Sequence, residues 1–300
     1  MAATESAQAS AQPGAEAPAA PSIRWEAKLA LSYALRGART VLARRSHSGP
    51  LRVQRDLYPE GEGTCHTIVV HPPGGIAAGD VLGVNVVMEP GSAALLTTPG
   101  AGKWYGSRSL SGQTAVGAEQ SLAFELGSGA VLEWLPQETI VFDGARADMA
   151  TSVRLHDHAL YLGWEILCLG RTASGERFSR GCVRQRTEIW QGSARLWVER
   201  GRLEGGDPLL ESPIGLAGHT VCATLLAAGR DLPDDLLAEC RGVRADGGAL
   251  CGITRLPRLA VARYLGDSGE DARGYFAALW TLLRPALKSC AAVAPRIWAT

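Results

Sequence analysis

The stretch His71-Pro-Pro-Gly-Gly-Ile-Ala-Ala-Gly-Asp80 separates two apolar segments, residues 67–70 and 81–88, that the sequence predicts to be β-strands. Prolines fix φ and remove backbone donors, whereas glycines allow backbone angles that other residues avoid. The residues that give this loop its shape are Pro72, Pro73, Gly74, Gly75 and Gly79. We interpret the stretch as a rigid loop that presents a His and an Asp at its ends, which is typical of a site, although a plain strand connection has the same composition.

Glycine-rich loops also bind phosphates, but this loop lacks the known phosphate-binding motifs. Neither G-x-x-x-x-G-K-[ST] nor G-x-G-x-x-G follows the first strand. A second strand follows the loop, whereas a phosphate loop opens a helix. The sequence therefore disfavours a nucleotide site here.

The composition limits the classes of partner and compartment. Of 300 residues, 30 are Lys or Arg and 30 are Asp or Glu, so no net charge attracts nucleic acid or an anionic membrane. No run of 18 apolar residues could cross a membrane, and seven scattered cysteines without C-x-x-C predict reduced thiols in the cytoplasm. We expect residues 1–22, rich in Ala and Pro, to be a disordered tail that is no targeting signal, and residues 23–300 to form a single domain.

The order of periodic segments predicts a mainly β fold. Strand candidates recur every 10 to 15 residues as far as residue 203, with Gly, Pro, Asp or Ser between them. Helical signals appear only in the last quarter, at residues 232–241 and 268–283, the second ending near Pro285. We predict many short strands in a large sandwich- or solenoid-like body, with a few helices mostly in the C-terminal quarter. No fixed period supports a strict repeat.

The candidate catalytic residues do not form a set. His156 and His158 lie in a polar turn, and we interpret them as solvated. Cys65 and His66 are adjacent on a strand, which places their side chains on opposite faces. No G-x-S-x-G or H-E-x-x-H motif occurs. A hydrolase or lyase that uses His71 and Asp80 as acid and base remains an alternative.

Acidic residues within apolar strands are the chemical feature that stands out. Glu165 and Glu199 lie in strands that should be buried, and Asp80 directly precedes one. Buried carboxylates are costly unless they are paired, hydrogen-bonded or bound to cations. Pairing with nearby arginines is one explanation. The other is a carboxylate-lined interior, with His71, Cys65 and His66 nearby, through which a divalent ion passes.

Several longer motifs occur in an order that resembles the UreD (UreH) family of urease accessory proteins, from residue 23 to residue 300. They are Gly49-Pro-Leu-Arg-Val-Gln-Arg55, Tyr58-Pro-Glu60, Cys65-His66, His71-Pro-Pro-Gly-Gly-Ile76, Thr97-Thr-Pro-Gly-Ala101, Leu132-Glu-Trp-Leu-Pro-Gln-Glu-Thr-Ile140, Cys168-Leu-Gly-Arg171 and Pro295-Arg-Ile-Trp298.

This resemblance implies a maturation factor that is not an enzyme. Proteins of this family bind the urease apoprotein and UreF, which recruits the GTPase UreG, and a tunnel is thought to pass nickel toward the urease dinickel centre. By resemblance, Asp80, Glu165 and Glu199 line that tunnel, and we expect them to stay ionised and free of tight arginine pairs. No tightly bound cofactor is expected, only transient nickel(II), and a purely structural adaptor remains an alternative.

The C-terminal residues 295–300 are apolar and aromatic for a chain end. Such a segment either docks on its own domain or belongs to a partner surface. Since aromatic anchors dominate interfaces, we expect Ile297, Trp298 and Trp280 to contact a partner such as UreF.

Overall fold

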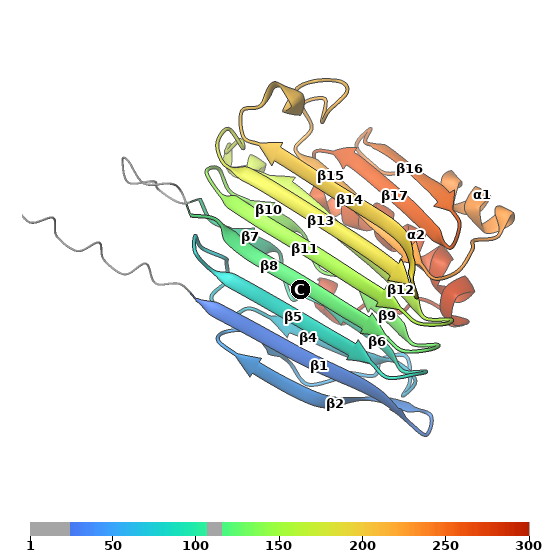
Figure 1. Ribbon diagram of the computed structural model, residues 1–300. Coiled ribbons are helices and arrows are strands. Elements are labelled where there is room, and N and C mark those ends of the chain that lie inside the picture. The colour runs from blue at the N-terminus through green and yellow to red at the C-terminus, as the bar shows by residue number, and fades with distance from the viewer. Residues whose placement is uncertain (1–24, 107–115, 300) are drawn as a thin grey trace, which may run out of the picture.

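The computed structural model describes residues 25–106 and 116–299, so the tail predicted at residues 1–22 lies outside the described residues. Two β-sheets lie face to face, and helices cover the outer face of the larger sheet (Figure 1). The prediction of a mainly β fold with a few helices, mostly near the C-terminus, is confirmed.

The smaller sheet has seven strands, and its outer face is exposed to solvent. In spatial order they are β14 (Ala194–Glu204), β13 (Cys182–Gln191), β11 (Arg146–Leu155), β8 (Ala118–Leu126), β5 (Val81–Met88), β1 (Glu26–Arg36) and β2 (Arg39–Ser48). Strand β5 alternates buried and accessible residues over much of its length, because only one of its faces is covered.

The larger sheet has ten strands and is covered on both faces over its centre. Its main path is β16 (Leu250–Leu256), β17 (Leu259–Gly266), β15 (Val221–Ala228), β12 (Leu160–Leu169), β9 (Val131–Trp134), β6 (Ala93–Thr97), β4 (Cys65–Val70) and β3 (Arg52–Val53), and β10 (Thr139–Val141) joins β12 to β7 (Gly102–Trp104). Strand β12 is almost wholly buried, which explains why its sequence is nearly continuously apolar.

The chain winds between the two sheets. From β4 to β13 it alternates between the larger and the smaller sheet, so β5, β8, β11 and β13 pair in parallel in one sheet while β4, β6, β9 and β12 do so in the other. The body is therefore a sandwich made by solenoid-like winding, which combines the two alternatives that the sequence left open, with antiparallel strands added at its sides.

Two helices pack on the outer face of the larger sheet: α1 (Asp234–Gly242) and α2 (Gly269–Lys288). Ser268 caps α2 by accepting a hydrogen bond from the backbone of Asp271. The helix extends beyond the predicted range 268–283, and Pro285 does not end it, because α2 runs through Pro285 to Lys288. Tertiary contacts of Arg284 and Lys288 hold this last turn. Short 3-10 turns lie at Thr172–Ser174, Pro208–Leu210 and Arg296–Ala299.

Three strands were not predicted. The segment of β15 is largely buried on both faces and so lacks alternation. Strand β16 is an edge strand with a central Gly, and β7 has only three residues inside a loop rich in Pro and Gly. Among the described residues, no helix is long and apolar enough to cross a membrane.

Candidate functional site

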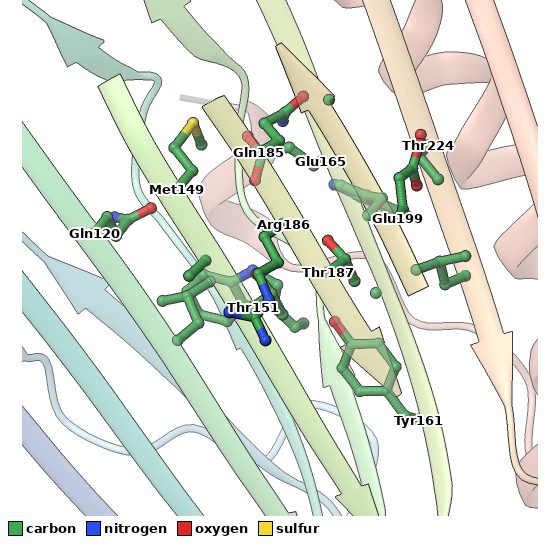
Figure 2. Close-up of a pocket in the computed structure, with 17 residues that line it drawn as sticks. Gln120, Met149, Thr151, Tyr161, Glu165, Gln185, Arg186, Thr187, Glu199 and Thr224 are labelled. Carbon is green, nitrogen blue, oxygen red and sulfur yellow. The ribbon is translucent and has the colours of Figure 1, made fainter. Parts of the chain in front are cut away.

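Glu165 lies at the middle of β12, on the face of the larger sheet that packs against the smaller sheet. Its neighbours on that face, Tyr161 and Leu167, belong to the core between the sheets. The Glu165 side chain lines three adjoining cavities, one of which Figure 2 shows from the side of the smaller sheet. Its carboxylate therefore lies deep in the sandwich and still faces open space.

The three cavities follow one another through shared residues. The loop-side cavity, about 320 Å³, borders the His71–Asp80 loop, and the edge-side cavity, about 580 Å³, lies between β14 and β17. A middle cavity of about 80 Å³ shares Gln120 and Trp134 with the first and Gln185 and Glu199 with the second. The three cavities thus neighbour one another across the sandwich, and their walls combine amide, hydroxyl and carboxylate groups with a larger apolar surface.

Glu165 forms no ion pair within the described part of the chain. Thr139 donates its hydroxyl proton to Glu165 Oε1 at 2.5 Å. Burial raises the pKa of the Glu165 carboxyl to about 7, while the Thr139 hydrogen bond opposes the rise. A cation that enters the cavities would therefore meet a carboxyl group that no arginine neutralises. With a pKa of about 7 this group is only partly ionised near neutral pH, which departs from the expectation that it stays ionised.

Glu199 does not meet the expectation of a carboxylate free of arginine. Arg263 donates to Glu199 Oε1 at 2.6 Å and to the hydroxyl of Thr224 at 2.6 Å. This pair forms because β17 extends the larger sheet past β14, so that Arg263 reaches Glu199 from the opposite sheet. The arginines nearest in sequence to Glu199 play no part in it.

The His71–Asp80 loop contributes its histidine to the cavity but not its aspartate. His71 lines the loop-side cavity, and burial lowers the pKa of its imidazole although the charge of Asp80 raises it. Asp80 Oδ2 accepts a hydrogen bond from the Ala77 backbone at 2.8 Å, and the Asp80 backbone donates to the Ala77 carbonyl. Asp80 therefore stabilises the conformation of the loop. His71 faces the cavity, and its imidazole is a group that can ligate a metal ion.

The glycine-specific backbone angles that the sequence suggests for this loop occur at Gly74 and Gly79 but not at Gly75. Gly74 has φ +76°, a conformation that favours glycine. Gly75 has no positive φ, yet a Cβ there would lie 2.2 Å from the ring of Tyr105. Gly74 thus serves the backbone conformation, and Gly75 serves the packing of the loop against an aromatic side chain.

Cys65 and His66 lie on opposite faces of β4, as their spacing predicted. Cys65 is buried in the core between the sheets, and burial raises the pKa of its thiol to about 11. The His66 ring lies on the helix side and contacts Glu60 Oε1 at 2.5 Å. Neither residue lines any of the three cavities around Glu165.

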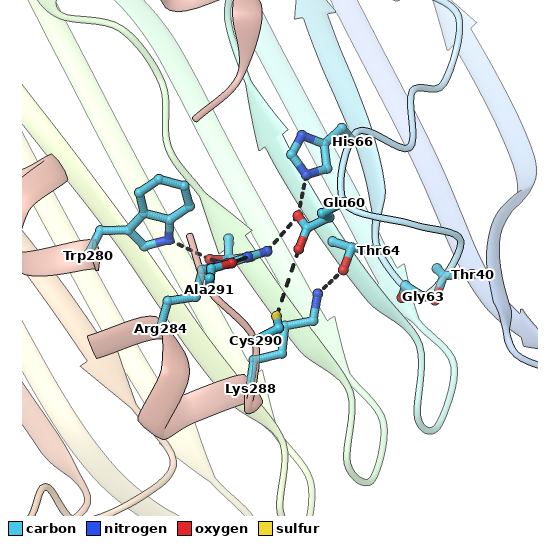
Figure 3. Close-up of polar contacts among 11 residues, drawn as sticks. Thr40, Glu60, Gly63, Thr64, His66, Trp280, Arg284, Lys288, Cys290 and Ala291 are labelled. Atoms are coloured by element: carbon cyan, nitrogen blue, oxygen red, sulfur yellow. Dashed lines mark hydrogen bonds and ion pairs between the residues drawn. The ribbon is translucent and has the colours of Figure 1, made fainter. Parts of the chain in front are cut away.

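A second polar site, the ionic cluster of Glu60, Glu133, Arg284 and Lys288, lies beneath the last turn of α2 (Figure 3). Arg284 Nε donates to Glu133 Oε1 at 2.9 Å, and its terminal nitrogen donates to Glu60 Oε1 at 2.6 Å. Burial raises the pKa of Glu60, but hydrogen bonds from His66 and Arg284 outweigh it and hold the value at about 2. Burial lowers the pKa of Lys288, which contacts the Thr64 hydroxyl.

The C-terminal segment docks on its own domain. Trp280 is buried and donates to Glu133 at 2.6 Å, so its expected role as a partner contact is wrong. Trp298 is half-buried, packs against Trp164 and Trp280, and donates its Nε1 proton to Thr97 at 2.9 Å. Ile297 is half-buried as well. These contacts form because α2 and the last residues share one apolar face of the larger sheet.

Sequence reasoning missed the partners of the acids. Glu133 and Arg284 are 151 residues apart along the chain, and Glu199 and Arg263 are 64 apart. One signal was present for the first pair, because Arg284 adjoins the apolar stripe of α2 that contains Leu279 and Leu283. An arginine on the buried side of a helix requires a buried acid.

Within the described residues, no group of three or more His, Cys, Asp or Glu side chains is arranged to hold a metal ion. The fold and site thus define a class: a two-sheet scaffold with an apolar core and internal cavities whose walls include the acids Glu165 and Glu199. Residues 26–299 match the family of UreD urease accessory proteins. The chain belongs to this family.

Individual relatives agree with the family match. The chain is 53% identical to the urease accessory protein UreD of Dechloromonas aromatica over 279 residues, which cover 92% of the chain and 95% of the relative. The identity is also 53% with UreD of Azoarcus sp. (92% and 94% covered) and 48% with UreD of Pseudomonas aeruginosa (92% and 95% covered).

Proposed function

We propose that the chain is a cytoplasmic, non-enzymatic urease maturation factor that binds apo-urease and UreF. In this role it passes nickel(II), supplied by the GTPase UreG through UreF, toward the urease dinickel site. Membership of the UreD family supports the urease role. The path for nickel is the series of three cavities, and the observation that carries it is that Glu165 lines all of them.

The chemistry of the cavity walls fits a metal ion in transit. Imidazole is a good ligand for nickel, and His71 offers it in the loop-side cavity. Carboxylate, hydroxyl and amide oxygens along the remaining walls are weaker ligands. A path requires sites that bind well enough to admit an ion and weakly enough to release it. A single unpaired carboxylate at the centre, with polar groups on both sides, meets that requirement.

The test is to remove the charge of Glu165 without changing its shape. Glu165→Gln should lower the nickel content of urease matured at limiting nickel several-fold, while pull-downs with UreF and apo-urease stay unchanged. The matched control is Glu119→Gln on β8, which removes an exposed carboxylate from the smaller sheet. Wild-type nickel loading by Glu165→Gln would reject the path and leave the chain as a structural adaptor.

A further inference from the structure

The charges of this neutral chain are unevenly distributed. Residues 26–55 contain one acid, Glu26, and seven bases: Lys28, Arg36, Arg39, Arg44, Arg45, Arg52 and Arg55. Because the full sequence has equal numbers of acidic and basic residues, the remainder carries the compensating negative charge. A net excess of six positive charges, seven bases less one acid, therefore belongs to one short part of the chain, which includes β1, β2 and β3.

These bases gather along one side of the sandwich. Strand β2 ends the seven-stranded sheet, β3 ends the main path of the ten-stranded sheet, and β2 contacts β4 beside β3. The strands β1 and β2 form the outermost ribbon in Figure 1. Arginines from two sheets thus border the same free edge.

The second half of β2 is an uncovered edge. The loop after β3 covers the start of the strand, where the Thr40 backbone donates to the Glu62 carbonyl at 3.0 Å. From Ala43 to Ser48 every residue is exposed, and β1 is the only strand that pairs with this stretch among the described residues. Six residues with exposed main-chain groups are long enough to pair with an added strand.

The arginines next to this edge form no ion pair with the described residues. Arg44 and Arg55 have no ion-pair partner in the described part of the chain, and Arg45 interacts electrostatically with the half-buried Asp56 without forming an ion pair. Arg44 lies opposite Ser32 and Arg45 opposite Leu31, so the two guanidinium groups leave opposite faces of the strand. By contrast, Arg39 is paired with Glu62 and stacked on Tyr58.

We propose that the edge of β2 between Ala43 and Ser48 binds an acidic, extended segment of a partner protein. The segment adds one strand to the seven-stranded sheet through main-chain hydrogen bonds, and its acids pair with Arg44, Arg45 and Arg55. Charge alone also favours nucleic acid, but a narrow strand edge with cations on both faces matches an extended peptide better than a broad phosphate backbone. Charged residues at a strand edge can also prevent aggregation, and the experiment below distinguishes that role from peptide binding.

The probe is a fluorescent eight-residue peptide of alternating Glu and Val, titrated into the full-length protein and followed by anisotropy. We expect binding that weakens several-fold between about 50 and 200 mM salt. Hydrogen exchange should show new protection, on binding, of the alternate amides within residues 43–48 that point away from β1. The same peptide with alternate backbone nitrogens methylated keeps its charges but loses donors, and it should bind at least about tenfold more weakly.

The double variant Arg44→Glu, Arg45→Glu should bind the acidic peptide at least about tenfold more weakly than the unchanged protein. Its control, Arg146→Glu with Arg154→Glu, makes the same charge change at exposed positions of β11 and should stay within about twofold. Equal binding of the methylated peptide, or tighter binding of single-stranded DNA without amide protection, would overturn the proposal. So would no binding of any probe, which would leave the arginines as edge protection.

Discussion

Glu133 and Glu165 lie on neighbouring strands of the ten-stranded sheet, yet their carboxylates face opposite sides of it. Glu133 receives hydrogen bonds from Arg284 and Trp280 beneath α2. Glu165 receives one from the Thr139 hydroxyl and otherwise faces cavities. Solvent exposure does not show which of the two carboxyl groups has a structural role and which a functional one, since both lie deep in the protein. The difference is whether the protein itself supplies the countercharge.

The largest effect should follow from removing the countercharge of the ionic cluster. Arg284→Met leaves Glu133 and Glu60 buried without their guanidinium partner, which should lower the free energy of unfolding by about 3–5 kcal/mol. The measurement is chemical denaturation. Arg263→Met, which removes the half-exposed partner of Glu199, should cost no more than about 1 kcal/mol. Equal losses would show that the two acids are held in the same way.

The same substitution should have opposite signs at the two acids. The pKa of Glu165 is raised from about 4.5 to about 7, so folding favours its protonated form. Its contribution to stability is complete below about pH 4.5 and is lost as the pH rises through about 7. Glu165→Gln should therefore raise the unfolding free energy at pH 8 by about 3 kcal/mol and flatten its pH dependence over that interval.

Glu133→Gln provides the contrast, because it leaves the buried Arg284 with one charged partner fewer. It should destabilise the protein at pH 8 by about 3 kcal/mol. Unfolding curves of both variants at pH 5 and pH 8 give the comparison. A loss of stability for Glu165→Gln at pH 8 would mean that its carboxylate is held by a partner, as in the cluster.

The smallest effect concerns the shape of the cavity wall. Gly74→Ala forces an L residue into φ +76° beside the loop-side cavity and should cost about 1 kcal/mol of stability. Gly37→Ala, at φ +62° in the exposed β1–β2 turn, should cost a similar amount. Only Gly74→Ala should also reduce nickel loading of urease. Equal nickel loading of urease by both variants would show that the loop only connects two strands.

Much of the fold was predictable wherever one face of a strand meets solvent. The bounds of β5 were predicted to the residue, because most of its length alternates. Strand β15, largely buried on both faces, gave no such signal. The winding was predicted only as one of two architectures, since periodicity does not say which sheet a strand joins.

The candidate site, like the fold, was predictable only in part. Glu165 was identified because an acid among apolar residues on a buried strand is costly and so needs an explanation. The sequence could not predict the partners of the other two acids. Arg263 binds Glu199, and Asp80 accepts a hydrogen bond within its own loop. Short-range patterns located the charges, but pairing over long separations decides which of them stay unneutralised.

The contact between Glu133 and Arg284 joins the middle of the chain to its end. A protein made from its N-terminus acquires both acids of the cluster long before the arginine that neutralises them. Until α2 is complete, the helix side of the larger sheet carries uncompensated carboxylates and cannot close over its apolar residues. The protein therefore completes this face of its fold only after α2 has been synthesised. A chain that stops before Arg284 leaves that face exposed to chaperones and proteases.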